Sequence, residues 1–458
     1  MSGNVVVILL VNLVLLLLGV GLMPLLGLAA TPLQLLLRLP LAFAVGIATA
    51  GVFGQALELA RVPLGPVGLT ILAVAALAGG SLKLLRESAS EEPARPGSSR
   101  LSFGVGLASL GFALVLLLHA AHAYAVRPLR EYDGWVIWAT KARALFELGG
   151  VDGAAFANDV YDHTDYPLLL PTLEAIGFRA LGEFDGTALH LQLAALAFAF
   201  IGAAWTISRA SASPAVTGLA ILAAVSAPAV LTQLGWNYAD IPVAMFCALG
   251  AAALAAWLQA DEAWLLRVGV LFLSAAALTK SEGTMFALAA LAALLAVLAV
   301  SGRNRLRPAL LGLGVLVLAI LPWRVYVAVN DLHPADYELS NLVDAGYLAD
   351  HADRLRPTVS ELAEELAKTS NWGLLLPLVG CAFATALLRR RYAAASFGGL
   401  WLAFSFAGLL LVYWISELEL EPDLFNTSYR TIATPVLGAA LLVPQLVGRD
   451  SVPVGTDS

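Results

Sequence analysis

Charged residues are scarce in this sequence. Asp, Glu, Lys and Arg make up 13% of the 458 residues and hydrophobic residues 60%, whereas soluble domains carry about 25% charged residues. A water-soluble fold has no core large enough for so many apolar side chains. Apolar stretches of about 20 residues recur along the chain, and each is long enough to cross a hydrocarbon layer of about 30 Å as a helix. The composition therefore predicts an integral membrane protein.

Cysteine is nearly absent too. Cys247 and Cys381 both lie in apolar stretches far apart in the sequence, which favours two small core residues over a disulfide or a metal-binding pair. No H-x-x-x-H or C-x-x-C spacing indicates a zinc site. Basic clusters do not exceed three residues, and the net charge is −7. This charge balance argues against nucleic acid as a partner.

Several patterns of other protein classes are also missing. No Lys or Arg precedes Arg38, so the first apolar run lacks the basic start of a cleavable signal peptide and is interpreted as a retained helix. We find no repeat of fixed period and no matched pair of broken helices, which are typical of secondary transporters. The absence of these patterns weakens the hypothesis of a transporter but does not exclude it. No segment remains for the Rossmann-like domain of a soluble nucleotide-sugar enzyme.

The apolar runs predict an all-α fold, a polytopic transmembrane bundle of about 13 spanning helices with interfacial helices in the outer loops. The expected spans are 4–23, 36–58, 64–82, 101–124, 190–208, 214–233, 241–258, 264–279, 283–301, 308–327, 373–388, 394–414 and 431–447.

Basic residues orient this bundle. Three short connections contain Lys83 and Arg86, then Arg303, Arg305 and Arg307, then Arg389, Arg390 and Arg391. Alternate loops share a side if these connections are cytoplasmic, because short cytoplasmic loops carry an excess of Lys and Arg. The C-terminus is then inside and the N-terminus outside in the plasma (inner) membrane. The first three helices are oriented only weakly, because Arg38 and Arg61 are their only flanking basic residues.

The map divides the chain into five parts. These are N-terminal transmembrane helices (1–124), an outer loop with interfacial helices and a candidate catalytic Asp (125–189), central transmembrane helices (190–327), an outer acidic loop (328–372) and C-terminal transmembrane helices (373–458). We interpret 167–183, which contains two prolines, as an interfacial helix. Most acids of the long loop are expected to be solvated. They are Asp331, Asp336, Glu338, Asp344, Asp350, Asp353, Glu361, Glu364 and Glu365.

The first candidate site follows the fourth helix, in the segment REYDGWVIW around Asp133. Trp135 and Trp138, three residues apart, are expected to share a helix face at the headgroup level. Lys141 and Arg143 supply positive charge nearby, as an anionic headgroup or phosphate would need. An ordinary interfacial belt with balancing charges is the alternative interpretation.

Asp240 begins the second candidate, NYADIP, where the chain returns into the membrane. An Asp followed by Pro in the first turn is a good helix N-cap. The map also places Asp240 on the same side as Asp133. Two converging carboxylates could divide base and orienting duties or bind a divalent cation. Both interpretations remain open.

Three further candidates lie on the same side. Lys280 and Glu282 interrupt an otherwise apolar stretch, either as a functional site or as a simple outer turn. Arg430 precedes the last helix and could hold a phosphate, or pair with Glu421 or Asp423. His163 is the one histidine inside a dense polar cluster, YDHTDYP.

In order, these pieces resemble the type C glycosyltransferase superfamily, which uses polyprenyl-phosphate sugars and includes protein O-mannosyltransferases and aminoarabinose transferases. The resemblance covers about 125–325 and the last helix. It rests on the strings EYDGWVIWATKARALFELGG, DYPLLLP, NYADIPVAMF, LTKSEGTMFAL and SYRTIATPVL. Two departures stand out: Gly134 occupies the place of a frequent second acid, and the family's His before the prolines is replaced, with His163 two residues ahead of Asp165.

The resemblance implies a glycosyltransferase whose site faces outward. Asp133 would be the general base of an inverting transfer, and Asp240 would position the sugar or the acceptor. The implied substrate-binding residues are Lys280, Arg430, His163, Tyr132, Lys141 and Glu282. The implied partners are a polyprenyl-phosphate-linked sugar, membrane lipid and a glycan, lipid or protein acceptor; no cofactor is certain beyond a possible divalent cation. The rival hypotheses are a transporter or flippase for a lipid-linked or small solute, and a non-catalytic scaffold.

Overall fold

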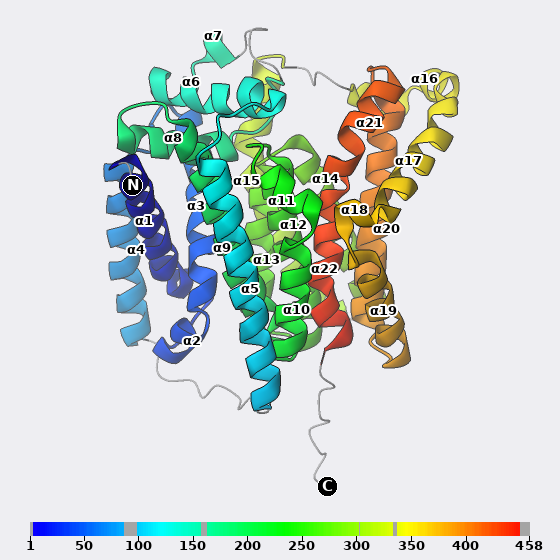
Figure 1. Ribbon diagram of the computed structural model, residues 1–458, viewed down its shortest axis with the longest axis horizontal. Coiled ribbons are helices and arrows are strands. Elements are labelled where there is room, and N and C mark those ends of the chain that lie inside the picture. Colours follow the sequence, from blue (N-terminus) through cyan, green and yellow to red (C-terminus); the bar gives the residue numbers. More distant parts are fainter. Residues whose placement is uncertain (1–2, 87–98, 157–162, 302, 333–336, 449–458) are drawn as a thin grey trace.

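The computed structural model describes residues 3–86, 99–156, 163–301, 303–332 and 337–448. Helices make up nearly all of this part of the chain, and its only β-pairing is a single bridge between Tyr337 and Ser416. The helices pack into one bundle with short helices across one end (Figure 1). The all-helical membrane fold is thus confirmed.

Within the described ranges, ten helices are long and apolar enough to cross a membrane. They are α1 (Gly3–Leu25), α3 (Leu39–Leu59), α4 (Pro66–Arg86), α5 (Arg100–Ala125), α9 (Gly186–Ser208), α12 (Asp240–Ala260), α14 (Ser281–Ser301), α15 (Leu306–Val329), α20 (Tyr392–Ile415) and a last span, Leu420–Val447, made of α21 (Leu420–Thr431) and α22 (Ala433–Val447).

The remaining three expected spans are helical but different. The range 214–233 is divided into α10 (Pro214–Val225) and α11 (Pro228–Leu234), bent by 60°, because Pro228 disfavours helical geometry in the residue before it. The helices α13 (Ala263–Ala277) and α19 (Leu375–Leu388) have 15 and 14 residues, fewer than the roughly 20 that a bilayer requires. The structure therefore supports ten spans, or eleven with the bent pair, and does not confirm thirteen.

Small residues bring the helices close together. A Cβ on Gly19 of α1 would lie 1.8 Å from the carbonyl oxygen of Ala42, and one on Gly46 of α3 would lie 1.9 Å from that of Leu15. Such backbone contact is how transmembrane helices gain packing energy, since lipid is as apolar as their side chains. The central helix α12 is buried along its length, whereas α4, α5 and α15 expose much of theirs.

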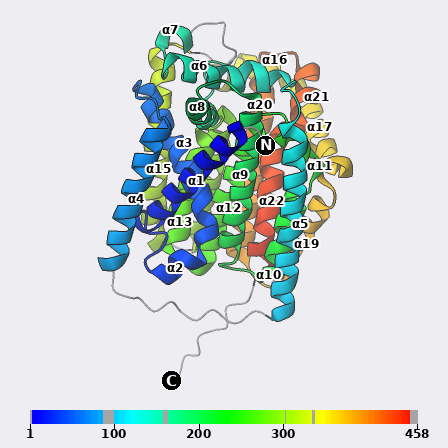
Figure 2. The same cartoon turned by 60° about the vertical axis from the view of Figure 1, so that its left-hand side comes forward.

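Several arginines from separate connections gather at one end of the bundle. There Arg38 pairs with Glu262 at 3.3 Å, Arg305 with Asp261 at 3.1 Å, and Arg391 donates to Gln259 at 2.9 Å. These contacts gather two of the three basic connections at the turn between α12 and α13. At the opposite end lie α6 (Thr140–Leu148), α7 (Gly153–Phe156), α16 (Ala345–Asp350) and α21 (Figures 1 and 2). The arrangement suits a multi-pass membrane protein with alternating loops.

The helix expected at the interface over 167–183 is α8 (Leu169–Leu181). Every residue from Leu169 to Phe178 is buried, and the helix contacts α3, α6 and α1. Arg179 binds the buried carboxylate of Glu58 with both guanidinium nitrogens, at 2.5 and 2.9 Å. Because α8 is covered on all sides by protein, its interfacial placement is not confirmed.

The long outer loop is a chain of short helices. It contains η3 (Leu339–Val343), α16, η4 (Ala352–Arg354), α17 (Leu355–Ala367) and α18 (Thr369–Trp372). Six of its nine acids are exposed: Asp331, Glu338, Asp344, Asp350, Asp353 and Glu364. Glu361 and Glu365 are buried and pair with Lys368 at 3.7 and 2.8 Å. Asp336 lies outside the described residues.

Candidate functional site

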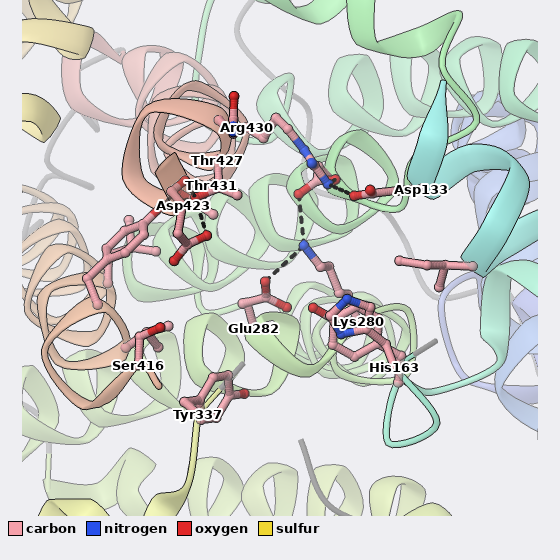
Figure 3. A pocket seen from close by; sticks show the side chains of 17 residues that line it. Asp133, His163, Lys280, Glu282, Tyr337, Ser416, Asp423, Thr427, Arg430 and Thr431 are labelled. Carbon is pink, nitrogen blue, oxygen red and sulfur yellow. Dashed lines mark hydrogen bonds and ion pairs between the residues drawn. The ribbon is translucent and has the colours of Figure 1, made fainter. Parts of the chain in front are cut away.

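A cavity of about 250 Å³ opens where several helix ends meet, at the end of the bundle opposite the α12–α13 turn. Figure 3 shows its side chains converging from both sides of the cavity. It is lined by residues from 125–189, from the start of α12, from the loop 328–372, from α20 and α21, and from the turn between α13 and α14. The lining residues are Asp133, Ile137, His163, Tyr166, Asp240, Lys280, Glu282, Tyr337, Leu409, Val412, Tyr413, Ser416, Asp423, Asn426, Thr427, Arg430 and Thr431.

Six of the eight residues expected at the site line this cavity: Asp133, Asp240, Lys280, Glu282, Arg430 and His163. The other two do not. Tyr132 is 66% exposed on the outer surface. Lys141 is buried behind the cavity wall, where its ammonium donates to the backbone carbonyl of His163.

The five charged candidates form one continuous chain of ion pairs. Arg430 lies 2.5 Å from Asp133 and 3.1 Å from Asp240, and Lys280 lies 3.0 Å from Asp240 and 2.9 Å from Glu282. Asp240 thus joins both cations, one through each carboxylate oxygen. With three carboxylates and two cations, the chain carries one net negative charge. The alternative pairing of Arg430 with Glu421 or Asp423 is wrong.

Asp240 reaches this chain because it does not cap its helix. It is the first residue of α12, Ala239 is the cap residue, and no side chain caps this helix end. The N-cap interpretation is therefore wrong, and the carboxylate faces the cavity instead. The preceding turn contains Asn237 at φ 56°, a left-handed conformation that Asn tolerates better than most residues. This turn sets the start of α12 beside the cavity.

Asp133 is followed by a π-helix, η1 (Gly134–Ala139). In this wider helix Trp135 and Trp138 face different directions. Trp135 is 49% exposed, whereas Trp138 is buried and stacks on Tyr166 with the ring centroids 5.6 Å apart. The expectation that they share one face is wrong, because it assumed α-helical spacing. Short π-helical segments recur at functional sites. A Cβ on Gly134 would lie 2.1 Å from the carbonyl oxygen of Trp236, so this close packing leaves no room for the acid that the resemblance suggests here.

Lys280 lies in the turn between α13 and α14. Its side chain is 8% exposed. Burial would lower the pKa of the ammonium group, but the carboxylates of Asp240 and Glu282 outweigh it and hold that pKa above its usual value. The interruption of the apolar stretch thus forms a turn whose charged side chains line the cavity.

The opposite wall of the cavity carries mainly hydroxyl groups. Tyr413 shares hydrogen bonds with the hydroxyls of Thr427 at 2.7 Å and Thr431 at 3.2 Å. Ser416 and Asp423 lie on the same side of the cavity (Figure 3). From the sequence, Asp423 is named only as a possible partner of Arg430, and no role is assigned to the other residues of this wall. A signal was present, since Asp423, Thr427 and Thr431 recur every four residues and share one helix face.

Tyr337 also lines the cavity, from the long acidic loop. Burial raises the pKa of its phenol, and the carboxylates of Glu282 and Asp165 act in the same direction. No sequence pattern distinguishes this tyrosine. Its position depends on the bridge to Ser416.

A second cluster of side chains lies next to the cavity residue His163. The rings of His163 and Tyr166 stack with their centroids 4.4 Å apart. Between them in sequence, Asp165 accepts from the Ser281 hydroxyl at 3.2 Å, and its backbone carbonyl accepts from Trp323 at 3.0 Å. Burial raises the pKa of the Asp165 carboxyl. Through these hydrogen bonds the segment before α8 contacts the first residue of α14 and the C-terminal part of α15.

The position suggested for a divalent cation is filled by Arg430. Its guanidinium lies between the carboxylates of Asp133 and Asp240, the two ligands such an ion would share. Among the described residues, no group of three or more His, Cys, Asp or Glu side chains is arranged to hold a metal ion. The donor set therefore does not fit a resident cation. Cys247 and Cys381 are both free thiols; Cys247 is a buried core residue, as the sequence predicts, whereas Cys381 is exposed.

Comparison with known proteins adds no relative: no protein-family model, no curated protein and no solved structure matches the chain.

Proposed function

We propose that this protein is a membrane glycosyltransferase that moves a sugar from a polyprenyl phosphate to an acceptor on the outer face of the plasma (inner) membrane. The observation that carries the proposal is the carboxylate of Asp133 at the edge of a polar cavity, paired with Arg430, which Asp240 in turn links to Lys280. The side chain of Asp133 is 23% exposed, against 4% for Asp240. Asp133 is thus the carboxylate of the chain that an acceptor reaches most easily.

The proposed reaction is a single inverting displacement. The acceptor oxygen or nitrogen attacks the anomeric carbon, and Asp133 takes the proton of that attacking group. The bond between the anomeric carbon and the phosphate oxygen breaks, and the lipid phosphate leaves with the electron pair. Lys280 and Arg430 stabilise the negative charge that develops on it. Asp240 holds both cations in place and is a positioning residue.

The hydroxyl-rich wall supports a sugar as the ligand. Tyr413, Thr427 and Asp423 present donors and acceptors across the cavity from the ion pairs. A sugar ring carries several hydroxyls that need such partners when they leave water.

The runner-up is a flippase or transporter for a lipid-linked or small solute. The 60° bend between α10 and α11 favours it, since broken helices are common in transporters. Against it, the polar cavity lies at the outer ends of the helices, while transporter sites lie near the middle of the membrane.

The decisive test supplies membranes containing the protein with a radiolabelled polyprenyl-phosphate sugar and measures transfer. We expect transfer by the wild type and at least a hundredfold slower transfer by Asp133→Asn. Asp353→Asn, which changes an exposed acid of the long loop, is the matched control and should behave as wild type. Equal rates for Asp133→Asn and wild type would remove Asp133 from the mechanism, and no transfer with any donor would favour transport.

A further inference from the structure

Arg324 is a charged residue within a membrane-spanning helix. It lies in α15 (Leu306–Val329), five residues before the helix ends. Leu310, Val317 and Leu321 share its helix stripe and are 53%, 43% and 47% exposed, as expected of side chains that face lipid. An ionisable residue within a spanning helix is costly and by default indicates function.

Two contacts place Arg324 at the depth of the cavity. Its guanidinium donates to the Thr284 hydroxyl at 3.4 Å, two residues after the cavity residue Glu282. Its neighbour Trp323 donates to the backbone carbonyl of Asp165 at 3.0 Å. The charge of Arg324 also acts on the cavity residue Tyr337. Arg324 therefore lies beside the cavity on the side of α15.

The cations of the site differ in how far they are already neutralised. Lys280 and Arg430 each contact two carboxylates. By contrast, no carboxylate of the described residues lies within 4 Å of the Arg324 guanidinium. Among the described residues its one hydrogen bond is the 3.4 Å contact to the Thr284 hydroxyl. A phosphate that approaches Lys280 or Arg430 must compete with carboxylates. At Arg324 the planar fork of donors remains available.

We propose that Arg324 binds the phosphate of a single-chain lipid, whose hydrocarbon chain lies along the exposed stripe of α15. That this lipid is a polyprenyl phosphate rests on the proposed function. Arg324 would hold the phosphate at the membrane side of the cavity and so direct the attached group toward the hydroxyl-rich wall. The assignment gives the donor an approach from the membrane that does not require breaking the ion pairs that Arg430 and Lys280 make with Asp133, Asp240 and Glu282.

The test measures binding without any transfer. Purified protein in nanodiscs of neutral lipid is titrated with polyprenyl phosphate, and bound lipid is counted by native mass spectrometry. We expect Arg324→Ala to raise the dissociation constant at least about tenfold, as loss of a charge-assisted hydrogen bond should. Arg324→Lys should weaken it less. Arg307→Ala, which removes an exposed charge at the other end of α15, is the matched control and should leave binding unchanged.

Competitors identify the ligand. Inorganic phosphate should not displace the lipid, and phosphatidylglycerol should displace it only in large excess. Equal affinities for wild type and Arg324→Ala would overturn the proposal, as would equal competition by phosphatidylglycerol or by inorganic phosphate. Unchanged thermal unfolding of Arg324→Ala excludes misfolding, and Arg324→Lys provides the test if that variant does not fold. Binding that depends on Arg324 without sugar transfer would leave this inference standing and reject the glycosyltransferase.

Discussion

Asp240 shows how strongly one side chain can organise a membrane site. Its carboxylate accepts from Lys280 and Arg430, and all three side chains are at most 10% exposed. A buried charge is tolerated only when it is paired and hydrogen-bonded. The same contacts that stabilise Asp240 therefore hold both cations at the edge of the cavity. They also bring Asp133 to it through Arg430.

We expect Arg430→Ala to destabilise the protein, because the carboxylates of Asp133 and Asp240 would lose their shared cation. Breaking a buried ion pair costs about 3–5 kcal/mol. Arg430→Lys retains the charge but not the planar guanidinium, so it should lose less stability than Arg430→Ala. Thermal unfolding in detergent measures both. Arg356→Ala, at an exposed position, is the control, and equal unfolding midpoints for the two Ala variants would contradict the prediction.

Glu174 in α8 should make stability depend on pH. Burial raises the pKa of its carboxyl well above the usual value, and the Asn237 amide only partly offsets this. The folded state then keeps its proton where the unfolded state loses it. The free energy of unfolding falls as pH rises from the ordinary glutamate pKa of about 4.3 toward the raised folded value, by at most about 1.4 kcal/mol per pH unit.

Glu174→Gln removes this dependence. We expect the variant to match wild type at about pH 4, below the unfolded pKa, and to be the more stable protein at higher pH, by a margin that grows with pH. Unfolding midpoints between about pH 4 and 8 measure the effect. Glu183→Gln, at an exposed position, should show no such trend. A constant difference between Glu174→Gln and wild type at every pH would refute this account.

At the scale of elements, the start of one helix and a π-helical turn determine the site. The chain around Asp133 can approach the turn before α12 only because Gly134 has no side chain against Trp236. Asp133 and Asp240 belong to these two elements. Their separation across Arg430 therefore depends on how closely the elements pack.

Gly134→Ala tests this packing. Its Cβ would lie 2.1 Å from the Trp236 carbonyl oxygen, so one of the two backbones must move. A displacement of about 1 Å at a reacting group can slow catalysis about a hundredfold, and we expect transfer to fall at least tenfold. Gly111→Ala in α5 adds a Cβ where nothing lies within 4 Å. This control should transfer sugar at the wild-type rate. A wild-type rate for Gly134→Ala as well would show that the packing has no role.

On the scale of the whole molecule, a cluster of arginines and the cavity lie at opposite ends of the bundle. The α12–α13 turn collects Arg38, Arg305 and Arg391 at one end, and the cavity opens at the other. If the basic end is cytoplasmic, the cavity faces outward. Substituted cysteines can test that orientation directly.

We propose to place single cysteines at Val343 and Leu388, which are 88% and 84% exposed, in a chain lacking Cys247 and Cys381. A membrane-impermeant maleimide added to intact cells should label Val343→Cys. Leu388→Cys, beside the basic connection after α19, should be labelled only after permeabilisation. The reverse pattern would place the cavity on the cytoplasmic side.

Local composition determined much of this protein. Apolar runs specify helices without reference to partners, because a buried backbone in lipid must satisfy its own hydrogen bonds. All thirteen expected ranges are largely helical, and the polar segments singled out from the sequence meet at one cavity. Lys280 and Arg430 are candidates because charged residues at membrane depth are rare, whereas Asp133 and Asp240 are candidates because they lie where a helix leaves or enters the membrane.

Only the tertiary structure decided which of these residues act together. Asp133 and Arg430 are 297 residues apart in sequence, and no local pattern encodes their contact. Packing also buries α8 and accompanies the wider helical turn after Asp133. It places Asp240 at the centre of the ion-pair chain, where the sequence suggests a helix N-cap. Hydropathy and charge describe each segment's preference for lipid or water. Partners, exposure and the cavity follow from side chains brought together across the bundle, where low dielectric makes each pairing consequential.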